Sequence, residues 1–525
     1  MDSVGDSNDN FMIIDDKAYT EDKVLIYNVF LYRIPQVISD ADLREYFQQY
    51  GTIALLKTKK PPDQDSRYEP TKIGFIHFRD PNAATNVLKK PTHLINNFRL
   101  NVQPSDTWHQ PKAKQTIEQV TKKDLIPQIE YISMLNDDCV IRITENLGLG
   151  DRIAFALAWQ PYRNIFIMTS KVTYKTVLLD NLQPLTLYQV REFLQMVGAS
   201  VETLKGKILH KKWMRIAELL NRYCRNVKSV LMYDKSVNTR FLRKLLIGMT
   251  SLIVLELHYV GLRDEDMDVL KELPNLKVLR LSMNLLKGST LGELSSIEEL
   301  SLYYCPIQTV YLRNICLNMK GLRVLDVRRC EKLKTLAFAE IASHCLNLET
   351  LKLSGYKSCC DDIAKLPKLK NLVFHAEIPM GPALFIELAK YQSDQLEKLI
   401  LQGEDCINAE NVEYICKLKK LKILGCASSD ALDDMRLREL SELSELEEID
   451  VADCKGISNT GLLDFVEKSY KLRRLNIINC TQLKVQLHCV FLSVCCKLIA
   501  LTDKVAWFWL KPKNHPQHSS HVPTN

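Results

Sequence analysis

Residues 456–480 read GISNTGLLDFVEKSYKLRRLNIINC, and this stretch holds the pattern that decides most of the fold. Its second half contains an L-x-x-L-x-L phrase, preceded by an amphipathic stretch. The phrase occurs in ten clear copies, whose starts lie 21 to 27 residues apart. The copies begin at Leu252, Leu276, Ile297, Leu322, Leu348, Leu369, Leu396, Leu421, Leu446 and Leu472.

A spacing of roughly 20–29 residues is typical of leucine-rich repeats. Each copy supplies a short strand with inward leucines and a helix such as DEDMDVLKEL, and neither can bury its apolar side except against neighbouring copies. The pattern therefore predicts a curved solenoid over residues 171–510, with weaker copies at Val227 and Leu498. Four copies run on to a cysteine, at Cys305, Cys330, Cys454 and Cys480, where we expect the side chain to pack from turn to turn. Residues 201–505 resemble the cysteine-containing leucine-rich repeats of F-box proteins.

The inner face of such a solenoid is the expected binding surface for a protein partner. Residues between the strand leucines project from it, because side chains alternate along a strand. Individually, each of these positions is more often a solvated strand residue than a contact. The candidates are Glu256, His258, Arg280, Tyr303, Asp326, Arg328, Asp450 and Asn476.

Residues 22–104 alternate strand-like and helix-like segments in the order β-α-β-β-α-β. The strands are expected at VLIYNV, TIALLK, KIGFIHF and FRLNV, and the helices at DADLREYFQQY and PNAATNVLKK. This unit resembles an RNA-recognition motif, whose sheet carries rings that stack on bases. The overall expectation is an α/β protein: a ferredoxin-like domain, a short helical segment and an α/β solenoid.

The resemblance places the six-residue motif of the family at Val24–Val29 and the eight-residue motif at Thr71–Phe78. Only one of the three stacking positions is then aromatic, so the sheet is expected either to bind RNA, to bind a protein or another part of the chain, or to serve as a scaffold. The candidate RNA-binding residues are Leu25, Tyr27, Lys57, Lys59, Lys60, Ile73, Phe75, His77, Arg99 and Asn101.

Residues 131–170 predict a short amphipathic helical hairpin, in which Asp151 is expected to cap the second helix. The segment resembles an F-box, which implies docking onto the Skp-type adaptor of a cullin-based ubiquitin ligase. The alternative is that these helices only cap the first repeat of the solenoid. The residues that match the F-box, and would contact the adaptor, are Leu135, Val140, Ile143, Leu147, Asp151, Tyr162 and Ile165.

Composition narrows the class of protein further. The formal charge is +7 on 525 residues, and the sixteen cysteines all follow residue 138, with neither a C-x-x-C pair nor metal-ligand spacing. We expect reduced thiols, no metal, no cofactor, no membrane span and a location in the cytoplasm, the nucleus or both. Residues 1–21, 105–130 and 511–525 are expected to be a disordered leader, a linker and a disordered tail.

No catalytic constellation is present, so a non-catalytic recognition subunit is expected. The main hypothesis is a substrate-recognition adaptor of a Skp/cullin/F-box ubiquitin ligase, whose substrate is an unknown protein and whose first domain binds single-stranded RNA or a protein. The alternative is an RNA-binding scaffold in mRNA processing or export that does not assemble a ubiquitin ligase.

Overall fold

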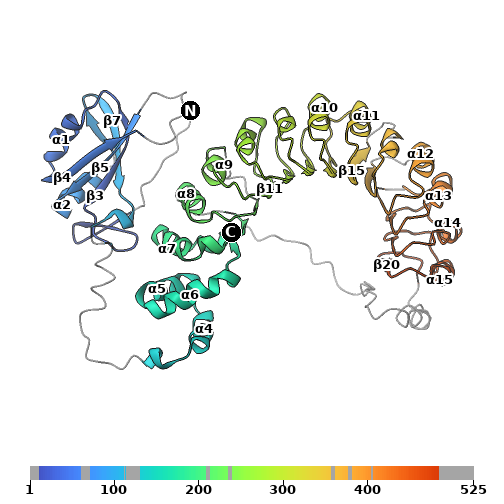
Figure 1. Cartoon of the computed structure of the whole chain (residues 1–525), viewed down its shortest axis with the longest axis horizontal. Coiled ribbons are helices and arrows are strands. Elements are labelled where there is room, and N and C mark those ends of the chain that lie inside the picture. Colours follow the sequence, from blue (N-terminus) through green and yellow to red (C-terminus); the bar gives the residue numbers. More distant parts are fainter. Residues whose placement is uncertain are drawn as a thin grey trace. The chain divides into compact units, whose positions relative to one another are not determined.

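The computed structural model describes residues 11–60, 71–90, 92–111, 113, 131–207, 213–233, 239–355, 361–376, 381–403 and 406–483. The chain divides into two compact units. Unit 1 comprises Met1–Val201 and Leu209–Cys224, and unit 2 comprises Glu202–Ile208 and Arg225–Asn525. Figure 1 labels the helices and strands of both units.

Unit 1 contains a five-stranded antiparallel sheet in the order β4-β5-β3-β7-β6. Helices α1 and α2 pack their apolar sides against one face of it, where Val29, Leu31, Ile76, Leu43 and Phe47 are all fully buried. A capping box formed by Ser39 and Asp42 fixes the start of α1. The elements are β3 (Asn28–Pro35), α1 (Asp40–Gln48), β4 (Ile53–Lys59), β5 (Thr71–Phe78), α2 (Pro81–Leu88), β6 (Thr92–Ile95) and β7 (Phe98–Pro104).

The predicted β-α-β-β-α-β order is confirmed, with one strand displaced. The first strand was expected at residues 24–29, but β3 occupies Asn28–Pro35. The short strand β6 was not expected; it forms a hairpin with β7.

Residues 11–20 form a β-hairpin, where a disordered leader was expected. Strands β1 (Phe11–Ile14) and β2 (Lys17–Thr20) pair antiparallel. Ala18 is fully buried in the core of the sheet domain, and its N–H donates to Thr85 Oγ1 of α2 at 2.9 Å. This packing and hydrogen bond order the segment, which composition alone did not indicate.

Helices make up most of the rest of unit 1. The predicted F-box-like segment consists of η2 (Tyr131–Met134), α4 (Asp137–Glu145), α5 (Leu149–Ala158) and α6 (Gln160–Thr173). Gly148, not Asp151, is the N-cap of α5, and Asp151 lies in its first turn. Next come β8 (Thr176–Leu178), η3 (Leu179–Leu182), α7 (Leu187–Val197), η4 (Gly198–Ser200) and α8 (Trp213–Tyr223).

Unit 2 is a parallel-stranded solenoid, as the repeats predict. Consecutive strands from β9 to β20 pair in chain order, and Figure 1 shows them on the inner side of an arc with the helices outside. The strands are β9 (Thr203–Gly206), β10 (Ser229–Tyr233), β11 (Val254–His258), β12 (Val278–Arg280), β13 (Glu299–Ser301), β14 (Val324–Asp326), β15 (Thr350–Gly355), β16 (Asn371–Ala376), β17 (Lys398–Gln402), β18 (Ile423–Gly425), β19 (Glu448–Asp450) and β20 (Arg474–Asn476).

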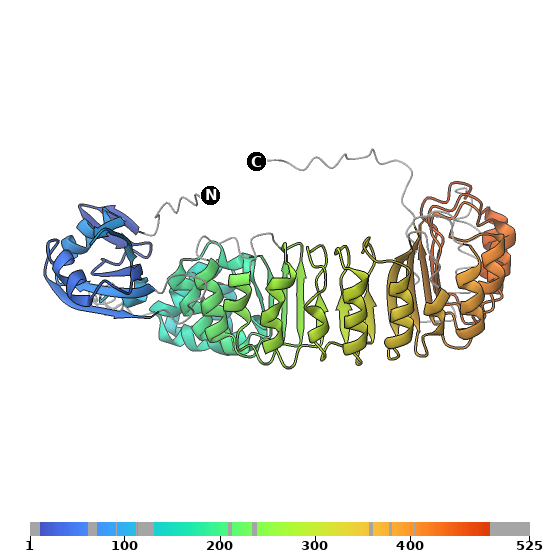
Figure 2. The ribbon, with the colours of Figure 1, turned by 90° about the horizontal axis from the view of Figure 1, so that it is seen from above.

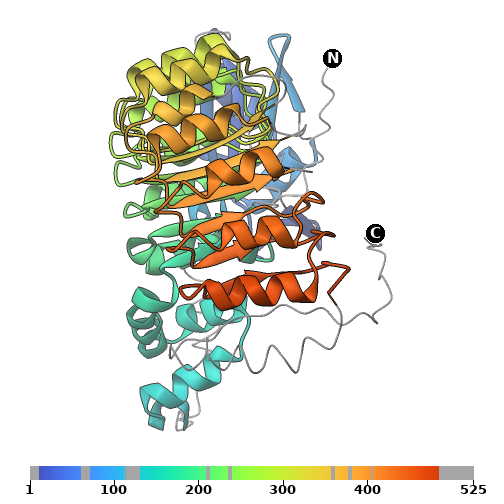
Figure 3. The same ribbon diagram turned by 90° about the vertical axis from the view of Figure 1, so that its right-hand side faces the viewer.

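The outer layer mixes α-helices with 3-10 helices. Figures 2 and 3 show these elements side by side along the unit, one repeat after the next. They are α9 (Thr239–Leu246), η5 (Asp264–Glu272), η6 (Leu291–Glu293), α10 (Thr309–Asn318), α11 (Leu336–His344), η7 (Asp361–Lys365), α12 (Ala383–Tyr391), α13 (Ala409–Ile415), α14 (Asp434–Leu440) and α15 (Asn459–Lys468). The DEDMDVLKEL stretch thus forms mainly a 3-10 helix.

The core of unit 2 is a ladder of strand leucines. Leu255, Leu279, Leu300, Leu325 and Leu351 pair in register and are fully buried. Beside this ladder, four cysteine thiols each donate to a carbonyl 24 to 29 residues earlier in the chain. The donors and their acceptors are Cys305 to Leu281 (2.9 Å), Cys330 to Leu302 (3.1 Å), Cys454 to Cys426 (3.5 Å) and Cys480 to Val451 (3.2 Å). The predicted packing of these cysteines from turn to turn is confirmed.

Candidate nucleic-acid interface and partner-binding surfaces

The sheet of unit 1 has an open face, defined as the side opposite α1 and α2. The strand register places Phe30 beside Phe75, Tyr32 beside Asn101, and Lys57 beside Phe75 on this face. Their neighbours in sequence, such as Val29 and Leu31, point to the core, because side chains alternate along a strand.

Two aromatic rings meet at the centre of the open face. The ring centroids of Phe30 and Phe75 are 4.8 Å apart, and Phe30 lies stacked 6.4 Å from Tyr32. Phe75 was predicted as a stacking residue, whereas Phe30 and Tyr32 were missed. The displaced strand explains the error: Leu25 and Tyr27 precede β3 and do not occupy its ring positions. The signal that could have identified Phe30 is its place between Val29 and Leu31, which are both buried.

Most of the other predicted RNA-binding residues lie around these rings. Ile73 and His77 are on β5, Lys57 and Lys59 on β4, and Arg99 and Asn101 on β7, while Lys60 directly follows the end of β4. Lys59 Nζ lies 5.8 Å from the centroid of the Phe75 ring, within the range of a cation–π contact.

His77 is positioned by a neighbour on the same face. Its Nδ1 lies 2.6 Å from Asn28 Oδ1, and partial burial lowers the pKa of His77. The face therefore combines rings, lysines and neutral hydrogen-bonding groups, the mixture on which single-stranded nucleic acids stack and pair.

The segment after β7, expected to be a linker, instead folds back onto the sheet domain as far as Gln110. Gln110 is buried, accepts from the N–H groups of Tyr27 and Asn28 at 2.9 Å each, and donates to the Asn28 carbonyl at 2.9 Å. These contacts hold η1 (Thr107–His109) against the edge of the open face. Of the expected linker, residues 112 and 114–130 lie outside the described part of the chain.

The residues that match the F-box divide into a buried and an exposed set. Val140 on α4 and Tyr162 and Ile165 on α6 are buried, and the Tyr162 ring lies 4.7 Å from that of Phe155. Leu135, Ile143 and Leu147 are exposed by 39%, 49% and 37%. The buried residues build the hairpin, whereas the exposed ones leave an apolar surface along α4.

The predicted partner-binding residues lie on the strand side of unit 2 and form local ion networks. Arg280 pairs with Glu256 and, at 2.7 Å, with Glu299, while His258 lies 3.3 Å from Glu256. These charges are largely satisfied by one another.

A second network lies two repeats further along the solenoid. Arg328 pairs with Asp326 at 2.8 Å and lies 5.3 Å from the Tyr303 ring. The last two candidates support their own turns: Asp450 accepts from the N–H of Ala452 and Asn476 from that of Ile478.

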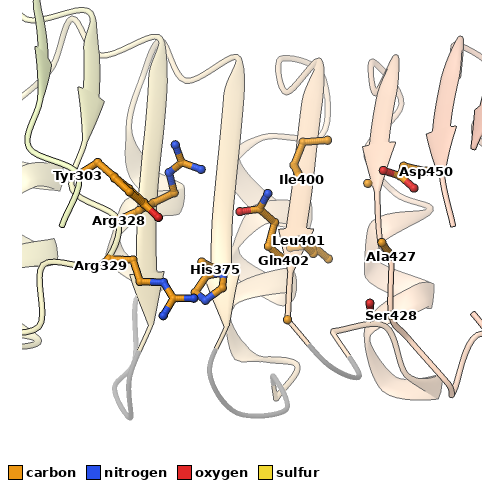
Figure 4. Close-up of a pocket in the computed structure, with 12 residues that line it drawn as sticks. Tyr303, Arg328, Arg329, His375, Ile400, Leu401, Gln402, Ala427, Ser428 and Asp450 are labelled. Atoms are coloured by element: carbon orange, nitrogen blue, oxygen red, sulfur yellow. The ribbon is translucent and has the colours of Figure 1, made fainter. Parts of the chain in front are cut away.

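A groove of about 480 Å³ occupies the middle of this surface (Figure 4). Tyr303 and Arg328 line one end and Asp450 the other, with Ile400 and Gln402 between them. Gly425 and Ala427 keep the floor low where other repeats carry larger side chains. Three of the eight predicted partner-binding residues therefore share one groove.

Among the described residues, no group of three His, Cys, Asp or Glu side chains could hold a metal ion. In the same part of the chain, no helix is both long and apolar enough to cross a membrane.

Comparison with known proteins identifies the first domain. The profile of the RNA recognition motif family matches residues 29–101. The SRA stem-loop-interacting RNA-binding protein, mitochondrial, of Bos taurus is 33% identical over 86 residues, which are 16% of this chain and 71% of that protein. Through this domain the chain belongs to the RNA recognition motif family. The match begins at Val29, in agreement with the position of β3 and not with the strand expected at 24–29.

Similar solved structures include two with matches over most of the chain. An internalin from Listeria monocytogenes str. 4b F2365 has a TM-score of 0.35 at 17% identity, covering 58% of this chain and 96% of the internalin. A TLR13–ssRNA13 complex has a TM-score of 0.38 at 16% identity, and the match covers 59% of this chain and 53% of the TLR13 chain. The RRM3 domain of Mip6 has a TM-score of 0.13 at 12% identity, and the match covers 15% of this chain and 94% of the Mip6 chain.

Proposed function

We propose that the chain is a non-catalytic RNA-binding scaffold of the cytoplasm or nucleus, in which the RNA recognition motif holds single-stranded RNA and the solenoid holds a protein. The observation that carries the proposal is the Phe30–Phe75 pair, 4.8 Å apart on the open face, with Lys57 and Lys59 on the neighbouring strand. The RNA-binding relative supports the same assignment. The Tyr303–Asp450 groove is the proposed site for the protein partner.

Removal of the two central rings tests RNA binding. Stacking on an aromatic ring contributes about 1–3 kcal/mol per base. Phe30→Ala and Phe75→Ala should therefore each weaken binding of a fluorescein-labelled mixed-sequence oligoribonucleotide by about tenfold or more, measured by fluorescence anisotropy. Phe98→Ala is the matched control, since Phe98 is an exposed ring at the β6–β7 turn. Unchanged affinity after loss of both Phe30 and Phe75 would remove the open face as an RNA site.

A second candidate function is favoured by the apolar surface along α4. We propose that Leu135, Ile143 and Leu147 dock onto a Skp-type adaptor, which would make the chain a substrate receptor of a cullin-based ubiquitin ligase. Apolar helix surfaces of this kind are common docking sites for partner proteins. Three large side chains, each more than a third exposed on one short helix and its flanks, support this proposal.

The docking proposal is tested by copurification with a Skp-type adaptor and cullin. Ile143→Asp with Leu147→Asp should abolish copurification, because the charges disrupt an apolar contact without entering the core. Val172→Asp is the control, as Val172 is 79% exposed on α6. If the unmodified chain brings down neither protein, the α4 surface has another role and the scaffold function stands alone.

A further inference from the structure

The open face continues beyond the RNA recognition motif as a row of rings. From the Phe30–Phe75 pair, the next ring is His109, 6.3 Å from Phe75 and nearly perpendicular to it. Trp108 follows at 5.7 Å from His109. The Arg191 guanidinium of α7 lies 5.2 Å from the centroid of Trp108 and ends the row. All these residues belong to unit 1.

The added rings are held in place by the chain around them. Besides the hydrogen bonds of Gln110, the Asn28 amide donates to the carbonyl of His109, and Thr107 Oγ1 donates to Asp22 at 2.5 Å. His109 is nevertheless about half exposed, so its ring remains available to a ligand. A ring that is both fixed and accessible binds a base at low entropic cost.

Several charged groups surround His109. Lys59, Arg191 and Arg215 lie near it; Arg191 pairs with Glu192 at 2.5 Å, and Arg215 pairs with Asp106 and Glu218. Burial, together with these three cations, lowers the pKa of His109, while Asp106 acts in the opposite direction. The imidazole is therefore largely neutral at neutral pH, and can stack like another aromatic ring.

We propose that His109 and Trp108 extend the RNA-binding face by two stacking positions, so that a bound single strand runs from Phe30 across Phe75 and His109 towards Arg191. The proposal rests on RNA binding by the open face and specifies how long a strand that face accommodates. A motif of this type stacks two or three bases on its own sheet. The added rings predict a longer site in this chain.

The length of the oligonucleotide separates stacking from a merely structural role. With a labelled mixed-sequence RNA of about eight nucleotides, His109→Ala and Trp108→Ala should each weaken binding by about tenfold. With an RNA of about three nucleotides, which fits on the sheet alone, both variants should bind like the unmodified chain. His109→Phe keeps a ring and should keep the affinity for the longer RNA. Phe98→Ala again serves as the control.

Three results would overturn the extension. The first is that His109→Ala, Trp108→Ala and the unmodified protein bind the longer RNA with equal affinity. The second is that either variant binds more tightly, as expected if these rings only cover Phe75. The third is that a variant loses the same affinity for both RNA lengths, as expected of damage to the fold. Binding that still depends on Phe30 and Phe75 in these cases would leave the proposed function intact. Loss of that dependence as well would remove both.

Discussion

At the scale of single residues, burial decides what the cysteines can do. The Cys305 and Cys480 thiols donate to carbonyls of an earlier repeat, and burial raises the pKa of each to about 11. A thiol that stays protonated is a poor nucleophile and a poor metal ligand. These cysteines therefore act as packing residues, whereas Cys139, on the surface of α4, is open to reagents.

The raised thiol pKa values predict a loss of stability at alkaline pH. Because the folded-state pKa of Cys305 lies above the unfolded value of 9.0, the protonated thiol contributes its full stabilisation of the fold below pH 9.0. This contribution is lost as the pH rises towards the folded-state pKa of about 11. For Cys305 this contribution to the free energy of unfolding is about 2 to 3 kcal/mol. Urea unfolding from about pH 8 to about pH 11 should show this decline, and a smaller one in Cys305→Ser, whose hydroxyl does not ionise there. Cys139→Ser should behave like the unmodified chain. Identical pH dependence in all three proteins would contradict the assignment.

At the scale of elements, a buried amide joins the repeats of β11 and β12. Asn284 Oδ1 accepts from the N–H groups of Val260 and Leu262 at 3.2 and 3.1 Å, and Nδ2 donates to the Leu257 carbonyl at 2.8 Å. The side chain is only 2% exposed, so water cannot replace it. The turn after β11 therefore depends on a residue of the next repeat.

Replacing Asn284 should open this turn locally. Asn284→Ala leaves two buried N–H groups and a carbonyl without partners, at a cost of about 3 kcal/mol or more. Hydrogen exchange at Val260 and Leu262 should accelerate strongly. Asn275→Ala removes an exposed amide that bonds the Thr250 carbonyl, and should cost less than about 1 kcal/mol. Equal protection of Val260 and Leu262 in both variants would show that another group satisfies them.

Element type was more predictable than strand position. The leucine spacing predicted the solenoid, because register and burial repeat with the sequence. The first strand of the sheet domain was displaced because residues 24–34, VLIYNVFLYRI, are apolar at most positions, so the sequence pattern does not fix where the strand begins. In the structure the strand lies later in the sequence, where Val29, Leu31 and Ile34 are buried in the core and a bulge lies between Leu31 and Ile34. Positions such as His109 and Gln110 depend on contacts between distant segments, which periodicity does not encode.

At the scale of the whole molecule, the net charge of +7 is spread over 525 residues, and the arrangement of the lysines matters more than their sum. Many basic side chains of unit 2 are paired, as Lys277 is with Glu298 at 2.6 Å. Lys57 and Lys59 are instead exposed beside the open face, and Lys59 contacts the Phe75 ring.

This distribution predicts which cations set the salt dependence of RNA binding. Each phosphate contact with a single strand contributes about 0.7 to the slope of log affinity against log salt. Lys57→Ala with Lys59→Ala should therefore reduce that slope by about 1.4, measured by anisotropy over a salt series. Lys277→Ala removes one paired lysine and should leave the slope unchanged. An equal reduction with Lys277→Ala would point to a diffuse effect of charge.

The parallel ladder of unit 2 also sets how the chain responds to mechanical load. Within the described part of the ladder, each strand pairs with the strand of the repeat before it and of the repeat after it, so tension along the chain would separate the repeats in turn. With 21 to 27 residues per repeat, each release would lengthen the tether by roughly 70–90 Å at about 3.4 Å per residue. The solenoid would thus extend in steps of similar size, and a load on a bound partner could be relieved one repeat at a time.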